Sequence, residues 1–252
     1  MYAILLCCVI SHSAQSSVIE YPNWFLYPSK FPTITIGYNS PDSTALQNAA
    51  KRRTVLESCV AKGSLFLYEV TNDYDFNKDS DYYYYYSFQR AKEFEKEMTS
   101  VDRYIINVLN DEYIEAFKSD TTEIDSIYYL GIDEILKPHW VEGKSFYEQD
   151  GYYYSVGLYT SIGRDNDAWI TSEEQAMFNL LRNIYIQING ITKVIDSEND
   201  LDDSYERVSA HKLNTKMSNI EVLERYPDRE AQLYFTLIRA KKENIKIVNK
   251  QQ

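Results

Sequence analysis

One pattern constrains the fold of this 252-residue chain more than any other, and it occurs twice: a short strand ends at a glycine, and a helix with small residues on one face follows. In the first copy the strand ends at Gly37, and the helix carries Ala45 and Ala49. In the second copy the strand ends at Gly157, and the helix carries Ala176. A small apolar helix face can lie close against a sheet. The repeat therefore predicts an α+β fold of two similar units, each a helix packed on an antiparallel sheet.

Capping signals predict where these two helices begin and end. Ser40 is a good N-cap for the first helix, which is expected to continue to a stop at Gly63. In the second helix Thr171 and Glu174 match a capping box, and Gly190 marks the end. The second helix is thus expected to be about one turn shorter than the first. Its predicted buried stripe consists of Met177, Leu180, Leu181, Ile184 and Ile188.

One long extra helix is predicted over residues 88–117, between the two copies of the pattern. Apolar residues recur in it at helical spacing, namely Ile105, Ile106, Leu109, Tyr113 and Phe117. Strands are predicted over residues 33–37, 64–70, 124–136, 191–195, 220–224 and 231–238. Asp150-Gly151 is typical of a tight hairpin turn. The first unit is thus expected over residues 14–137 and the second over residues 138–240, and residues 241–252 are expected to form a charged tail.

The N-terminus is predicted to be a signal peptide. Residues 2–10 are an uninterrupted apolar run, and small polar residues follow it. Cleavage is expected before Ala14, which would remove residues 1–13. The alternative is that residues 2–10 form a buried first strand. This run is too short to span a bilayer and no later stretch is long enough, so no transmembrane segment is predicted.

The number and positions of the cysteines are consistent with export. Removal of residues 1–13 leaves Cys59, so no intramolecular disulfide is expected, and Cys59 itself is predicted to be a small buried residue. A lipid tether at Cys7 or Cys8 is the alternative to simple secretion. The predicted location is the periplasm or the outer surface of the envelope.

Charge and composition restrict the classes of partner. The chain has 38 acidic and 26 basic residues, and its formal net charge of -12 would repel nucleic acid and an anionic membrane surface. Neither is expected as a partner.

The tyrosine content of the chain bears on its sheets. The 24 tyrosines outnumber the 10 phenylalanines, and a ring with a polar hydroxyl suits a half-buried strand. Antiparallel sheets with one wet face are therefore expected.

No catalytic site and no cofactor are predicted. Outside the signal peptide the histidines are His139 and His211, and neither belongs to a nucleophile or metal motif. An acidic loop is a candidate for calcium because oxygen ligands occupy every second position, at Asp73, Asp75, Asn77, Asp79 and Asp81. Lys78 and Tyr84 stand where such a loop needs its glycine and its bidentate glutamate. Solvated loops are therefore expected there and in a second acidic run, residues 196–203.

The residues of the repeat also resemble a known family. The first copy contains Pro22-x-Trp24-Phe25 and Ile36-Gly37, and the second contains Tyr154-x-Val156-Gly157. With the small helix residues that follow, this pattern resembles the LPP-type twenty-kilodalton lipoprotein family of bacterial envelopes, which is similar to the N-terminal domain of a flagellar-assembly outer-membrane protein. The resemblance implies a helix on an antiparallel sheet, export, and no catalytic residues. Family members are usually lipidated at a clean motif, and this chain lacks one.

The predicted function is that of an exported, envelope-associated structural or protein-interaction protein without catalytic activity. Its partners are expected to be other envelope proteins or further copies of the chain, bound through a strand edge or a tyrosine-rich face. Residues 82–86 and 152–154 supply the tyrosines. The alternative is a secreted module that binds glycan or calcium.

Overall fold

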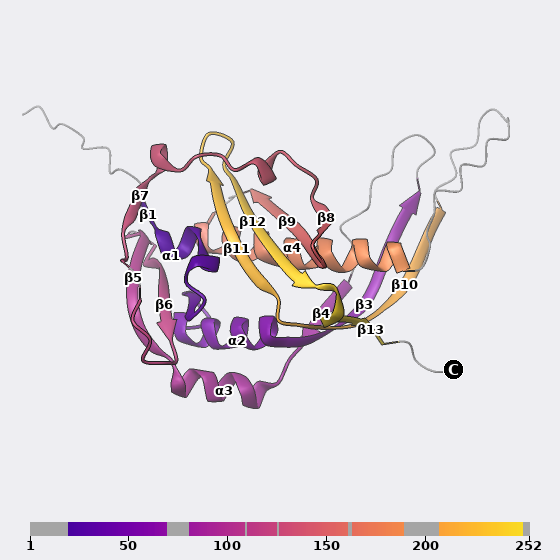
Figure 1. Cartoon of the computed structure of the whole chain (residues 1–252), viewed down its shortest axis with the longest axis horizontal. Coiled ribbons are helices and arrows are strands. Elements are labelled where there is room, and N and C mark those ends of the chain that lie inside the picture. Colours follow the sequence, from indigo (N-terminus) through magenta and orange to yellow (C-terminus); the bar gives the residue numbers. More distant parts are fainter. Residues whose placement is uncertain are drawn as a thin grey trace, which may run out of the picture.

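The structure is a computed structural model that describes residues 20–69, 81–108, 110–124, 126–160, 163–188 and 207–248. The protein is α+β, as predicted, with helices packed on antiparallel sheets (Figure 1). The described helices are α1 (Asn23–Leu26), α2 (Ala45–Glu57), α3 (Phe88–Glu97) and α4 (Asp165–Ile188). Short 3-10 helices are η1 (Pro28–Lys30), η2 (Ile132–Glu134), η3 (His139–Val141) and η4 (Lys242–Asn244).

The first sheet has the strand order β2-β6-β5. Its strands are β2 (Ile34–Tyr38), β5 (Thr99–Asn107) and β6 (Glu112–Lys118). Helix α2 packs on β2, and α3 lies beside α2. A separate two-stranded ribbon joins β1 (Glu20–Pro22) to β7 (Tyr129–Gly131).

The second sheet has the strand order β11-β12-β9-β8. Its strands are β8 (Phe146–Gln149), β9 (Tyr152–Thr160), β11 (Glu221–Asp228) and β12 (Leu233–Lys241). Helix α4 packs on β9 and β12. The hairpin turn predicted between β8 and β9 is present, because Asp150 and Gly151 both have positive φ, at 48° and 80°.

The two units share a topology. In each, one strand leads into a helix, and a later hairpin places its second strand antiparallel to the first strand. Strands β2, β5 and β6 of the first sheet thus correspond to β9, β11 and β12 of the second. The three strands of the first sheet precede residue 138, and the four strands of the second follow it.

A glycine sets the distance between strand and helix in both units. A Cβ atom on Gly37 would lie 2.0 Å from the carbonyl oxygen of Ala45, and one on Gly157 would lie 1.8 Å from that of Ser172. Both distances are far inside van der Waals contact, so only glycine lets the helix approach this closely. The pattern that defines the sequence repeat is therefore the pattern of close strand–helix packing.

A third sheet connects the two units and has the strand order β13-β10-β3-β4. Its strands are β3 (Ser58–Glu69), β4 (Asp81–Tyr85), β10 (Arg207–Ser218) and β13 (Ile245–Ile247). Strand β3 follows α2 directly and pairs with β10 over its whole length, from Ser58 opposite Ser218 to Glu69 opposite Arg207. Figure 1 shows these two strands extending together away from the body of the protein.

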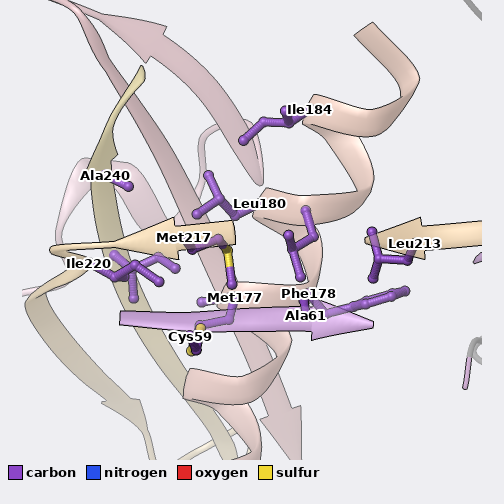
Figure 2. Close-up of a cluster of buried hydrophobic side chains, with 13 residues drawn as sticks. Cys59, Ala61, Met177, Phe178, Leu180, Ile184, Leu213, Met217, Ile220 and Ala240 are labelled. Atoms are coloured by element: carbon purple, nitrogen blue, oxygen red, sulfur yellow. The ribbon is translucent and has the colours of Figure 1, made fainter. Parts of the chain in front are cut away.

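Helix α4 lies between the second and third sheets, and its apolar stripe forms one of the two main cores. Figure 2 shows Met177, Leu180 and Ile184 of α4 in one buried cluster with Cys59 and Met217 of the third sheet. Of the predicted stripe, Met177, Leu180, Leu181 and Ile184 are buried, and the side chain of Ile188 lies outside the described part.

A second, aromatic core joins the two units. Phe25 of α1 lies between Tyr38 of β2 and Trp169 of α4, with ring centroids 6.1 and 5.1 Å away. Trp169 in turn meets Tyr234 of β12 edge to face at 4.7 Å. Edge-to-face contacts of this kind add to the hydrophobic stabilisation from burial. The two sheets are therefore joined by a shared core.

The prediction of one long helix over residues 88–117 is wrong. Helix α3 ends at Glu97, and the hairpin β5–β6 occupies the rest, with Asp111 at φ 48° next to the turn. The apolar spacing that suggested a helix comes from two strands read as one segment. β-Branched residues such as Ile105 and Ile106 favour strands, and pairing of β5 with β6, which itself pairs with β2, secures them in the sheet.

The predicted helix boundaries also need correction. The N-cap of α2 is Thr44, which forms a capping box with Gln47, while Ser40 makes a turn with Ser43. Helix α2 ends at Glu57 because residues 58–63 pair with β10. Helix α4 begins at Asp165, so Thr171 is internal, and α4 has 24 residues against 13 for α2. The second helix is the longer one.

Two further segments differ from prediction. Within residues 124–136 the described strand is limited to β7. The segment predicted as a charged tail contains η4 and β13, and β13 pairs with β10. The predicted strand 191–195 lies outside the described residues.

Candidate functional site

A buried cluster of three charged side chains lies where the two units meet. Glu173 of α4 accepts hydrogen bonds from Arg52 of α2 and, at 2.9 Å, from Arg225 of β11. The same arginines donate to carbonyl oxygens, Arg52 to Ile36 and Arg225 to Phe25. Arg225 is 1% exposed and Glu173 is 5% exposed. One carboxylate thus holds together a helix of the first unit and a strand of the second.

The electrostatics of this cluster keep Glu173 ionised. Burial alone raises the pKa of Glu173, but attraction and hydrogen bonds from Arg52 and Arg225 outweigh burial, and its pKa is lowered from the ordinary value. The pKa of Arg52 is raised because Glu173 offsets the desolvation that would lower it. Two guanidinium groups share one carboxylate, so the cluster carries a formal charge of about +1.

An open groove with a cavity volume of about 410 Å³ lies on one side of α2. Its walls combine apolar and polar residues of η1, β2 and the start of β11 with residues of α2, and the cations at the groove are Arg52, Arg53 and Arg225. Arg53 donates to Ser119 at 2.9 Å and lies over the ring of Phe94. All three arginines already interact with neighbouring residues of the protein, so the residues of this groove mainly stabilise the fold.

A second groove, the tyrosine groove, has a cavity volume of about 370 Å³ and lies between α2, α4 and β4. Tyr82, Tyr84 and Tyr86 form one wall, and Tyr82 stacks on Phe178 of α4 at 4.8 Å between centroids. Burial raises the pKa of Tyr82 to about 12. The polar side chains at the groove are Asn48, Lys51, Arg52, Glu173 and Glu174.

Strand β4 borders the tyrosine groove and is the last strand of its sheet. In the described part of the chain it pairs with β3 on one side and has no strand on the other. Its tyrosines alternate, with Tyr82 and Tyr84 turned toward α4 and Tyr83 and Tyr85 exposed by 62% and 56%. This is the alternation of faces that strand geometry requires.

In the other predicted tyrosine cluster, residues 152–154, the rings pack against other side chains of the protein. Tyr154 stacks on Tyr147 with centroids 4.8 Å apart, and Tyr153 stacks on Phe146 at 5.6 Å. Arg239 lies over the ring of Tyr152 at 4.7 Å. These half-buried rings therefore stabilise the β8–β9 hairpin, and the exposed rings of β4 are better placed to meet a ligand.

The remaining residues that the sequence suggested as candidate sites do not line these grooves in the part of the chain that the structure describes. Cys59 is buried in β3, as predicted, and burial raises its pKa to about 12. His139 is exposed in η3, and the side chain of His211 lies outside the described part. Of the calcium candidates, Asp73, Asp75, Asn77 and Asp79 lie outside the described residues, as do residues 196–203, and Asp81 begins β4. Among the described residues, no group of three or more His, Cys, Asp or Glu side chains is placed to hold a metal ion.

The charged cluster at the centre of the molecule was missed at the sequence level. Arg52, Glu173 and Arg225 are far apart in the chain, and each sits in an ordinary polar context. The one available signal was the position of Glu173 beside Ser172, in the helix segment that faces Gly157. A charged residue next to a face that must pack closely is a candidate for burial.

None of the helices in the described residues is long and apolar enough to cross a membrane. Comparison of the chain with protein-family models, with curated proteins and with solved structures found no match.

Proposed function

We propose that the protein is an exported, envelope-associated binding protein without catalytic activity, and that β4 and the tyrosine groove receive an extended segment of a partner protein. The partner is another envelope protein or a second copy of the chain. The proposed location is the periplasm or the outer surface of the envelope, after removal of residues 1–13. A lipid tether at Cys7 or Cys8 remains the alternative form of attachment.

The observation that carries this proposal is the edge of β4 that has no partner strand among the described residues, alongside the tyrosine groove. An extended segment that pairs with β4 would form main-chain hydrogen bonds along this edge. Because side chains alternate along a strand, every second side chain of the segment would point into the groove. Tyrosine rings offer such side chains a large apolar contact at low cost in conformational entropy.

Export is tested by expressing the full chain in a bacterial host and measuring intact mass and cell fraction. We expect a periplasmic or secreted product that begins near Ala14. A product that keeps Met1 and stays in the cytoplasm would contradict the envelope assignment. A mass increase equal to a lipid at Cys7 or Cys8 would identify a tethered protein.

Binding is tested with a photo-reactive amino acid placed at Lys51, an exposed residue at the tyrosine groove. The matched control carries it at Lys92, whose side chain is 44% exposed on α3. We expect a discrete crosslinked product from position 51 alone, and mass spectrometry of that product distinguishes a second copy from another protein. Hydrogen exchange of the isolated complex should show new protection of the β4 amides. Equal crosslinking from both positions would contradict a specific site.

A glycan is the second candidate ligand for the tyrosine groove. Tyrosine rings stack on sugars, and Asn48, Lys51 and Glu174 supply polar groups at the same groove. A glycan array separates the two candidates, because a sugar ligand should bind in the absence of any protein partner and should lose affinity in Tyr86→Ala.

A further inference from the structure

The outer face of the third sheet is a second exposed surface, opposite the face that packs on α4. Residues directly opposite each other in an antiparallel pair have their side chains on the same face, as do residues two positions apart in a strand. The register therefore gathers six exposed side chains on this face: Lys62, Lys212, Lys216, Lys246, Tyr83 and Tyr85. We refer to these six as the lysine–tyrosine face.

The lysines and tyrosines are arranged in rows across the strands. In one row Lys246 lies opposite Lys216, Lys216 opposite Val60, and Val60 opposite Tyr85. In the next row Lys62 lies between Asn214 and Tyr83. Each row thus runs from a cationic or polar end to an exposed ring at β4. Neighbouring positions in a row are about 4.8 Å apart, the spacing of strands in a sheet.

Among the described side chains, the charge of this face is unbalanced. The described ion pairs of the protein include none of its four lysines. Its described side chains include no carboxylate, and the side chain of Asp81, at the end of β4, lies outside the described part. Lys216 and Lys246 are directly opposite each other, an arrangement that destabilises a sheet unless an anion neutralises the charges. The ammonium group of Lys62 lies 5.0 Å from the ring of Tyr85.

Such a surface is unexpected on a chain with a net charge of -12. The net charge predicted that anionic partners would be repelled. At physiological salt, however, charges more than about 8 Å away are largely screened, so a ligand on this face responds mainly to the local lysines. A cationic face on an acidic protein is therefore a candidate for a specific anionic partner.

We propose that the lysine–tyrosine face binds a linear acidic polysaccharide, whose carboxylates pair with the lysines while its sugar rings stack on Tyr83 and Tyr85. Two observations favour this ligand over single-stranded nucleic acid. The cations of the face are all lysines, whereas arginine is the usual residue for forked recognition of phosphate. Neighbouring positions within a row are about 4.8 Å apart, which is close to the length of one pyranose unit. The proposal does not depend on a peptide at β4, because that segment would use the strand edge and the opposite face.

The test is a titration of the full-length protein with four probes at low salt. Octagalacturonate supplies both sugar rings and carboxylates, its methyl ester supplies rings alone, octaglutamate supplies carboxylates alone, and an eight-residue thymidine oligonucleotide supplies phosphates and bases. We expect octagalacturonate to bind most tightly of the four, and its affinity to fall as salt is raised. Failure to bind octagalacturonate would overturn the proposal. So would equal or tighter binding of octaglutamate or of the oligonucleotide.

Variants then assign the binding to this face. Lys62→Gln and Lys216→Gln should each weaken octagalacturonate binding about two- to fivefold, and the double variant about tenfold. Tyr83→Thr and Tyr85→Thr keep strand propensity and should weaken it about fivefold or more, with little effect on octaglutamate. Lys92→Gln on α3 is the matched control, since it removes one positive charge elsewhere. If Lys92→Gln weakens binding as much as Lys216→Gln, the site is not on this face.

Thermal unfolding of each variant separates loss of binding from loss of fold. The six side chains are exposed, so their variants should unfold within a few degrees of the original protein. Loss of the Lys216–Lys246 repulsion should make Lys216→Gln no less stable than the original.

Discussion

Glu112 of the first unit caps the helix of the second, because its carboxylate accepts a hydrogen bond from the backbone N–H of Asn166, the second residue of α4. Glu112 is 1% exposed, and Arg164 lies 3.9 Å from its carboxylate. The first N–H groups of a helix have no partner within the helix and favour a negative charge. Helix α4 therefore takes its cap from a strand of the other unit.

Replacement of Glu112 by alanine should lower the free energy of unfolding by about 1–3 kcal/mol, since a buried helix N–H loses its acceptor. Glu112→Gln keeps an acceptor oxygen and should cost less. Denaturant unfolding with circular dichroism measures both. If the alanine variant is as stable as the original protein, the cap makes no contribution.

The cluster of Arg52, Glu173 and Arg225 should make stability depend on pH in the acidic range. The pKa of Glu173 is lowered in the folded protein, so its contribution is present above the pKa of the unfolded state and is lost as pH falls through the folded pKa. Glu173→Gln should therefore flatten the decline of unfolding free energy that sets in as pH falls below about 5. Glu174→Gln should not flatten the decline, because desolvation and Glu173 raise the pKa of Glu174, so its titration opposes the decline rather than causing it.

At neutral pH, Glu173→Ala should destabilise the protein by about 3–5 kcal/mol, because two buried arginines lose their carboxylate. A loss of unfolding free energy below about 1 kcal/mol, the scale of a surface ion pair, would show that water hydrates the arginines when Glu173 is removed.

Gly157→Ala tests the close approach of strand and helix. Its Cβ would lie 1.8 Å from a backbone oxygen of α4, which cannot rotate away. We expect a loss of about 1–3 kcal/mol or more in unfolding free energy. Gly163→Ala, whose Cβ would meet nothing within 4 Å, is the control and should change it by less than about 0.5 kcal/mol. Equal effects at the two positions would contradict the packing described for β9 and α4.

Cys59 should be unreactive in the folded protein. It is 2% exposed, and its pKa of about 12 leaves almost no thiolate at pH 8. In a Cys7→Ser, Cys8→Ser variant, a thiol reagent should modify Cys59 at the rate of unfolding and at once in denaturant. Rapid modification without denaturant would indicate that β3 opens locally.

The sequence was most informative where local chemistry decides the structure. Gly37 and Gly157 marked the strand–helix contacts because close approach excludes every other side chain, and Asp150-Gly151 marked a turn that needs positive φ. The prediction for residues 88–117 was wrong because Ile105 and Tyr113 fit a helix by spacing. They lie directly opposite each other in the β5–β6 hairpin, and pairing of β6 with the distant strand β2 stabilises that hairpin.

For the candidate sites, too, local patterns could be predicted from the sequence and contacts between distant segments could not. The alternation of Tyr82 to Tyr86 was predictable, since period two follows from strand geometry. The lysine–tyrosine face was not, because Lys62, Lys216 and Lys246 become neighbours only through the register of three strands. Net charge alone pointed away from it.

The long pairing of β3 with β10 has a consequence for synthesis. When the ribosome has produced β3, its partner is still unmade, and at about 5–20 residues per second the wait lasts on the order of ten seconds or more. During that time a nascent strand with an unmatched backbone is open to wrong partners, including its counterpart on another growing chain. A chain held extended until it is complete would avoid this hazard, so passage through a secretion channel before folding would suit this topology better than folding on the ribosome.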